Sequence, residues 1–383
     1  MARSATTPVR LTSAQERDYR LSRHGLLGGS EALASIAAVA DTTFGLHAAR
    51  QSSPWVALRS RIPSFEAAHL RALLVAERQL VRIRCMRQTL HILPLPLATT
   101  AHRATLHQRL SPCRAKLRAL SASERSLRAF SARVRSHVAS GPVPYRDLQL
   151  AAAPSGRARD VALARLSIKW LWEAGELVHV DLSPSLHHEH RAFALTEQFC
   201  PTVEFKANEP EVELAREQLV LHHIRRFGPV AVGDIAWWSG LGPTVVRRAI
   251  ERLGSDLVSV RVDGIADELF ASADSVDGLV ASKSVEPSHV ALLAHEDPSL
   301  KGYFTTRHRY VADDHYALLF NQIGEARASI MVGGVAIGTW SFSRRSGRTS
   351  HKLFQPIPRS TEEAVHDRLA DMESFLGTEP VLA

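Results

Sequence analysis

One order of elements occurs twice in this chain of 383 residues and most constrains its fold. In each copy two helices are followed by two strands that a polar turn joins, which is the order of a winged helix. Tandem copies of such a module would share one basic groove. The expected helices span 142–153, 159–177, 211–228, 232–242 and 243–254, and the expected strand pairs lie within 177–199 and 257–274.

The remainder of the chain predicts an α+β protein rather than an all-helical one. Residues 1–95 resemble a third, more divergent copy, because they also end in an alternating strand at 82–95. Three strands at 316–322, 328–334 and 335–344 predict a C-terminal antiparallel meander that turns at Gly333–Gly334, and a helix closes the chain at about 361–376. We expect domains at 1–140, 141–208, 209–275 and 276–383.

Positive charge is concentrated in one region. The chain has 47 basic and 39 acidic residues, but residues 71–140 alone hold fourteen basic side chains and two acidic ones. Thirteen of the fourteen are arginine, whose planar guanidinium binds phosphate in a bidentate way. The region indicates a polyanion partner, and nucleic acid is favoured over a membrane surface, because no amphipathic helix with aromatic anchors is evident. The alternative is an ordinary solvated basic face.

Several classes are excluded by composition and motifs. No run of eighteen apolar residues is present, and the N-terminus has no apolar signal-peptide core, so we expect a cytoplasmic, nucleoid-associated protein without a membrane partner. Three scattered cysteines do not make a disulfide framework or a four-cysteine zinc site. The serine-hydrolase elbow, the Walker A loop and the dinucleotide fingerprint are all absent in their required contexts.

Two groups of side chains have a structural and a functional reading. His187 and His188 belong to a histidine-rich turn that lacks a fourth ligand at metal-site spacing, so a polar hairpin tip that contacts DNA as a wing is favoured. Trp237 and Trp238 are adjacent in an expected helix and therefore face different ways. We expect one to be core and the other to fill a seam between modules, with base stacking as the lesser alternative.

Four segments together carry a family resemblance over about residues 10–345. They are GLHAARQSSPWVALRSRI (45–62), LVRIRCMRQTLHILP (80–94), VGDIAWWSGL (232–241) and GTW (338–340). The chain resembles the AlkZ and YcaQ family of winged-helix DNA glycosylases. The resemblance implies tandem winged helices around a C-shaped, basic channel for duplex DNA. It also implies excision of alkylated bases, including bulky adducts of DNA-damaging natural products, against which such enzymes confer self-resistance.

The family's catalytic motif, Gln–aliphatic–Gln or Gln–aliphatic–Asp, aligns with His47, Ala48 and Ala49, so both polar positions differ. An N7-alkylated guanine is cationic and leaves as a neutral base, which leaves water activation as the main catalytic task. A neutral imidazole can accept the proton of that water, and we expect His47 to position or activate it. Gln51 is a weaker candidate for the lost amide. Alternatively, His47 only packs in a degenerate site.

The segment CMRQTLHIL resembles the family's Met-Arg-Gly-Thr-Leu-His strand. Alternation would place Arg87, Thr89 and His91 on one side of a strand. We expect Arg87 to hold a phosphate and Thr89 or His91 to orient the sugar or the water, close to His47. Alternatively, these side chains satisfy buried backbone groups. The expected DNA contacts are Arg50, Arg82, Arg84, Arg87, His187, His188, Arg344, Arg345 and Arg348.

The sequence therefore predicts a monofunctional DNA glycosylase that hydrolyses the N-glycosidic bond of alkylated purines, above all bulky N7-alkylguanine. It would act as a monomer on double-stranded DNA, without metal or cofactor. The alternative is a catalytically degenerate winged-helix protein that binds DNA adducts or regulates genes. Loss of the two motif glutamines favours the alternative, whereas the Arg87–His91 segment disfavours it.

Overall fold

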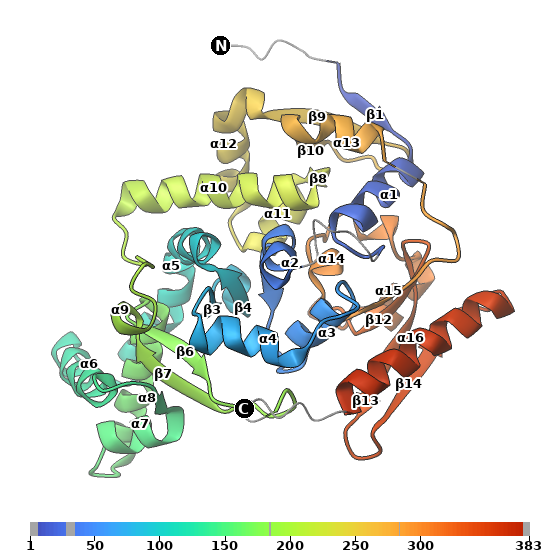
Figure 1. Cartoon of the computed structure of the whole chain (residues 1–383). Coiled ribbons are helices and arrows are strands. Elements are labelled where there is room, and N and C mark those ends of the chain that lie inside the picture. The colour runs from blue at the N-terminus through green and yellow to red at the C-terminus, as the bar shows by residue number, and fades with distance from the viewer. Residues whose placement is uncertain (1–6, 28–34, 184, 283, 378–383) are drawn as a thin grey trace. The chain divides into compact units, whose positions relative to one another are not determined.

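The computed structural model describes residues 7–27, 35–183, 185–282 and 284–377, and it combines helices with mainly antiparallel sheets (Figure 1). This confirms the α+β class. The chain divides into two compact units. The first unit joins Met1–Glu66 to Glu217–Pro380, and Ala67–Arg216 make up the described part of the second. The four consecutive domains expected from the sequence stay a prediction.

The first unit contains two four-stranded sheets. One has the order β1-β9-β10-β8, in which β1 is parallel to β9, and the other has the order β11-β12-β13-β14. Its elements are β1 (Val9–Leu11), α1 (Ser13–Arg23), α2 (Ile36–Thr42), β2 (Leu46–His47), α3 (Ser53–Arg59), β8 (Val230–Ala231), α11 (Val232–Ser239), α12 (Pro243–Leu253), β9 (Leu257–Val262), β10 (Leu269–Ser272), α13 (Val276–Val280), β11 (Val290–Leu293), α14 (Pro298–Lys301), α15 (Tyr316–Leu319), β12 (Ser329–Val332), β13 (Val335–Ser343), β14 (Arg348–Leu353) and α16 (Arg359–Gly377).

The second unit is built on strands in the order β4-β3-β6-β7-β5. The long helix α10 (Glu209–Phe227) runs from this unit into the first. The other elements are α4 (Ala67–Arg71), β3 (Leu80–Arg84), β4 (Leu90–Pro94), α5 (Leu95–Ala119), α6 (Glu124–Val138), β5 (Val143–Pro144), α7 (Tyr145–Ala152), α8 (Ala158–Glu173), β6 (Leu177–Asp181), β7 (Arg191–Leu195) and α9 (Thr196–Phe199).

The repeated order of elements is present in both copies. In the second unit α7 and α8 precede the β6–β7 hairpin, and β5 pairs with β7. In the first unit α11 and α12 precede the β9–β10 hairpin, and β8 pairs with β10. The local sequence explains the helices: Val246, Ala249 and Ile250 form the buried stripe of α12 at helical spacing.

The expected strand at 82–95 is wrong, because the chain reverses within it. Strands β3 and β4 form an antiparallel hairpin whose turn contains Arg87 at φ 50° and Gln88 at φ 59°. The Cys85 amide donates to the Thr89 carbonyl at 3.1 Å, and the Thr89 hydroxyl donates to the Met86 carbonyl at 2.9 Å, which closes the turn. Arg87 and His91 therefore do not share one side of a continuous strand.

The C-terminal expectations are partly confirmed. Strands β12 and β13 turn at Gly333 and Gly334, which both have positive φ, and the closing helix is α16, which lies along the β13–β14 hairpin in Figure 1. The strand expected at 316–322 is wrong, because its first four residues form the short helix α15. Strands β11 and β14 complete the sheet and were not expected.

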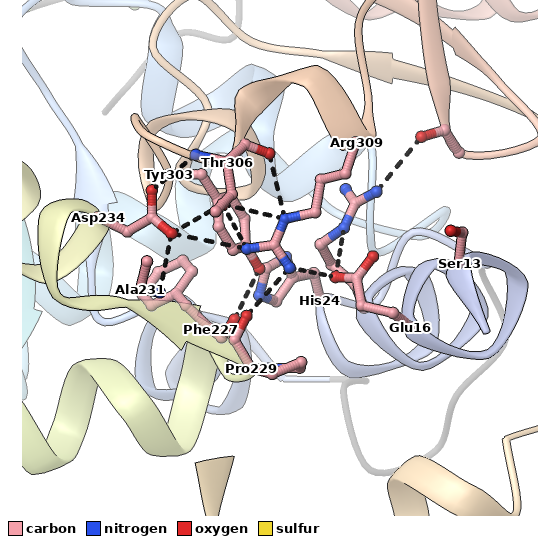
Figure 2. A network of polar contacts seen from close by, with 12 residues as sticks. Ser13, Glu16, His24, Phe227, Pro229, Ala231, Asp234, Tyr303, Thr306 and Arg309 are labelled. Carbon is pink, nitrogen blue, oxygen red and sulfur yellow. Dashed lines mark hydrogen bonds and ion pairs between the residues drawn. The ribbon is translucent and has the colours of Figure 1, made fainter. Parts of the chain in front are cut away.

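A buried ionic network centred on Arg309 holds the first unit together (Figure 2). Its guanidinium lies 2.9 Å from a carboxylate oxygen of Glu16 on α1 and 3.6 Å from Asp234 on α11. It also donates to the Pro229 carbonyl at 3.0 Å. Because both carboxylates and the guanidinium are nearly excluded from solvent, removal of one partner would leave an uncompensated buried charge. The network fixes α1, α11 and the segment around Arg309 relative to one another.

Candidate active site

His47, the residue at the motif position, lies on the short strand β2 and is 3% exposed. The chain reaches the surface two residues later, since Ala48 is buried whereas Ala49 and Arg50 are exposed. The motif thus runs from the interior of the first unit to its surface.

A buried carboxylate faces this imidazole. The Oε2 atom of Glu296 lies 3.8 Å from the Nε2 atom of His47 and also forms an ion pair with the ammonium group of Lys301. The other carboxylate oxygen of Glu296 accepts a hydrogen bond of 2.6 Å from the Ala326 amide. A carboxylate at this position favours the protonated form of an imidazole, so the arrangement can stabilise a histidine that has taken a proton from water.

The segment after β11 holds Glu296 in place. The backbone of Glu296 has φ 58°, in the left-handed region that residues with a Cβ rarely adopt. The Glu296 amide donates to the Ala326 carbonyl at 2.9 Å. The next residue, Asp297, caps α14 by accepting from the Ser299 amide at 2.9 Å. Because Lys301 ends the short helix α14, this cap also positions the ammonium group that pairs with Glu296.

Asp297 is fixed by a fully buried arginine. Two nitrogens of Arg61 donate to the two carboxylate oxygens of Asp297 at 2.8 and 3.0 Å, and neither side chain is exposed. Burial alone would raise the pKa of Asp297, but the Arg61 charge, its hydrogen bonds and those from Ser299 outweigh burial and hold that pKa below its ordinary value. This pair anchors the segment that carries Glu296 to the residues that follow α3.

His295 stands next to Glu296 and is half-buried. Burial, together with the positive charge of Arg50, lowers the pKa of His295 to about 4. At neutral pH His295 is therefore an uncharged imidazole. The exposed guanidinium of Arg50, close enough to act on His295, gives this side of the first unit a positive charge.

The other expected catalytic residues lie in different places. Gln51 follows Arg50 at the surface and is half-buried. Thr89 and His91 belong to the hairpin of the second unit, where His91 is 4% exposed and its Nδ1 atom lies 3.2 Å from the Thr89 carbonyl. The expected proximity of these two residues to His47 stays a prediction.

The expected DNA contacts differ in exposure. His188, Arg344, Arg345 and Arg348 are exposed, although Arg348 pairs with Glu373 at 3.0 Å, and His187 is half-buried, as is Arg87.

Two other expected contacts are engaged inside the second unit. Arg82 is 2% exposed and lies 3.1 Å from Asp181, and Arg84 lies 3.2 Å from Glu173. Such burial does not favour a phosphate contact by Arg82.

Part of the basic excess in residues 71–140 is balanced by acids from later in the chain. The buried Arg109, for example, lies 3.4 Å from Glu173. Other basic residues of this region remain exposed along the second half of α5 and on α6. There the second unit is hollowed by a groove of about 710 Å³ whose walls include Arg114, Arg118, Arg128 and Arg135, with Leu117, Leu127 and Trp170 among its apolar lining.

Sequence reasoning missed Glu296, Asp297 and Lys301. A signal was present, because His295, Glu296 and Asp297 follow the apolar strand β11 and precede Pro298, a common first residue of a helix. What the sequence did not reveal is that this segment folds against His47. Trp238 is core at 3% exposure and Trp237 is half-buried at the surface, so the expected difference between the two is confirmed.

The described residues contain no group of three or more His, Cys, Asp and Glu side chains arranged to hold a metal ion. Across the same residues, no helix is both long and apolar enough to cross a membrane.

A family model and a solved structure place this architecture among DNA glycosylases. Residues 40–375 match the family described as DNA glycosylase AlkZ-like, and the chain belongs to this family. The Streptomyces sahachiroi DNA glycosylase AlkZ has a similar fold, with a TM-score of 0.75 at 19% sequence identity over 96% of this chain and 97% of that one. A comparison with curated proteins finds no match.

Proposed function

We propose that this protein is a monofunctional DNA glycosylase that releases alkylated purines, in particular bulky N7-alkylguanine, from double-stranded DNA. Family membership supports the DNA glycosylase activity. The observation that carries the chemistry is the buried contact of 3.8 Å between His47 and Glu296, at the position where the family has its catalytic glutamine motif.

In this mechanism the positive charge on the alkylated base drives its departure. The sugar develops oxocarbenium character, and His47 accepts a proton from the water that attacks the anomeric carbon. Glu296 stabilises the resulting imidazolium, and the ion pair with Lys301 holds Glu296 in place. The base leaves neutral, so no acid has to protonate it, and no metal or cofactor is required.

The double-stranded substrate is supported by two features. The repeated order of two helices and a hairpin, with the short first strand at the edge, matches winged-helix modules, so we assign β5–β7 and β8–β10 to them. The exposed arginines on α5 and α6, together with Arg50, Arg344 and Arg345, supply positive charge for phosphates. The protein then acts as a monomer in the cytoplasm, at the nucleoid, and confers self-resistance to an alkylating natural product.

The burial of His47 favours one alternative, a DNA-adduct binder that has lost catalysis. Duplex DNA carrying N7-methylguanine or a bulky N7 adduct distinguishes the two functions. The glycosylase releases free modified base and leaves an abasic site, and His47→Ala lowers release by about 100-fold or more. The matched control His137→Ala changes an exposed histidine of α6 and leaves release unchanged. Binding without base release by the wild-type protein would establish the alternative.

A further inference from the structure

An exposed aromatic surface lies close to the candidate active site in the first unit. Phe304 is 44% exposed, and its ring stacks on Trp237 with ring centroids 5.1 Å apart and planes inclined by 10°. Tyr316 is 36% exposed and Ile323 is 68% exposed. Large apolar side chains of this kind that gather at a surface mark a contact with another molecule.

A buried arginine unites this surface. The guanidinium carbon of Arg307 lies 4.4 Å from the ring centre of Trp237 and 5.2 Å from that of Phe304, and one nitrogen donates to the Tyr316 hydroxyl at 3.2 Å. A cation beneath the rings polarises them and holds them in one orientation. We call Trp237, Phe304 and Tyr316, arranged around Arg307, the aromatic platform.

The network of Figure 2 makes the platform rigid. Asp234, three residues before Trp237 on α11, accepts from the Phe304 amide at 2.8 Å and from the Thr306 hydroxyl at 2.7 Å. Gly233 permits this close approach, because a Cβ there would overlap the Thr305 hydroxyl. A surface that is already ordered loses little entropy when a flat ligand stacks on it.

The platform is connected to His47 through two charged side chains. Lys301, the ion-pair partner of Glu296, has its ammonium nitrogen 5.9 Å from the ring centre of Trp237. Glu296 in turn faces His47 at 3.8 Å. Glu296 and Lys301 thus join His47 to the underside of the platform within the first unit.

We infer that the aromatic platform binds the planar aromatic part of a bulky DNA adduct and so determines which adducts the protein prefers. This inference rests on the proposed function. Stacking on an exposed ring recognises any flat aromatic group without hydrogen-bond readout, and its loss costs about 1–3 kcal/mol per stacked ring system. A small adduct such as a methyl group does not reach the platform and gains nothing from it.

The test measures binding alone. Duplexes carry one N7-(naphthylmethyl)guanine or one N7-methylguanine on a 2′-fluorinated sugar, which blocks hydrolysis, and the dissociation constants of the full-length protein are compared. We expect the wild type to prefer the naphthylmethyl duplex and Phe304→Ala to lose about tenfold on that duplex only. Phe304→Tyr keeps the ring and retains the preference, and Val280→Ala, a change at another exposed apolar residue, has no effect.

Two results would overturn the inference. Equal affinity of wild type and Phe304→Ala for the naphthylmethyl duplex would show that nothing stacks on the ring. An equal loss on naphthylmethyl, methyl and undamaged duplexes would assign the platform to ordinary DNA bases. Neither result bears on catalysis, because base release from unfluorinated DNA tests the proposed function separately. If the wild-type protein stacks the adduct but does not release the base, the inference about the platform stands and the proposed glycosylase activity is rejected.

Discussion

Two regions of the molecule, the surroundings of His47 in the first unit and the groove beside α5 and α6 in the second, use charge in opposite ways. In the first unit, the ions near His47 are buried and paired: Arg61 with Asp297 and Lys301 with Glu296. In the second unit, Arg114 and Arg118 stand exposed on α5 beside a wide groove. Buried pairs fix geometry and are costly to break, whereas exposed arginines act at longer range and are screened by salt. The comparison shows that a high density of charged residues in the sequence does not reveal whether they form buried ion pairs or lie exposed at the surface.

The largest expected effect is on the buried side of this comparison. Arg61→Met removes one partner of a fully buried pair and leaves the Asp297 carboxylate uncompensated, so we expect a loss of about 3–5 kcal/mol in the free energy of unfolding. Urea denaturation of the variant and the wild type measures it. Arg125→Met, at an exposed arginine of α6, serves as the control and stays within about 0.5 kcal/mol of the wild type. Equal effects of the two changes would break the comparison.

The same pair predicts how the loss depends on pH. The pKa of Asp297 lies below its ordinary value of 3.8 in the folded protein, so its ion pair contributes stability above pH 3.8 and loses it as the pH falls through the folded pKa. The difference between wild type and Arg61→Met is therefore largest at neutral pH and shrinks on acidification, from the pH at which the uncompensated Asp297 carboxyl of the variant takes up a proton. Denaturation curves collected between pH 3 and pH 7 test this, and a difference that grows on acidification would contradict it.

Glu296→Gln sharpens the comparison at the candidate active site. The change keeps the size of the side chain but removes the negative charge that faces His47, and we expect base release to fall by about 10- to 100-fold. Affinity for an uncleavable adducted duplex should change little, which separates positioning of His47 from loss of DNA binding. Glu268→Gln, at an exposed acid before β10, is the matched control. An unchanged rate would remove Glu296 from the mechanism.

The smallest expected effect is on the exposed side. Replacing Arg114 and Arg118 by alanine should lower the slope of log affinity against log salt by about two units if both contact phosphates. Folding should be unaffected, because both side chains are exposed. The double variant Arg344→Ala/Arg345→Ala applies the same measurement to the first unit. If only the Arg344→Ala/Arg345→Ala variant changes the slope, the phosphate contacts lie outside the groove of α5 and α6.

The sequence alone determined the repeated order of two helices and a hairpin, and the family. Apolar spacing along α12 and turn residues such as Gly333 and Gly334 act over a few positions, so local patterns encode them. Local patterns did not predict the reversal within 82–95. Arg87 and Gln88 adopt a left-handed backbone conformation there, and no glycine in the turn indicates it. Alternation alone cannot separate one strand from two strands with a turn between them.

Only the tertiary structure decided which side chains meet. The contact of His47 with Glu296, the partners of the arginines in 71–140 and the stacking of Phe304 on Trp237 all join residues far apart in the chain. Such pairs depend on how whole elements pack, and no local period specifies that packing. The sequence therefore showed that the motif glutamines were replaced, and the fold supplied the carboxylate that stands beside the histidine.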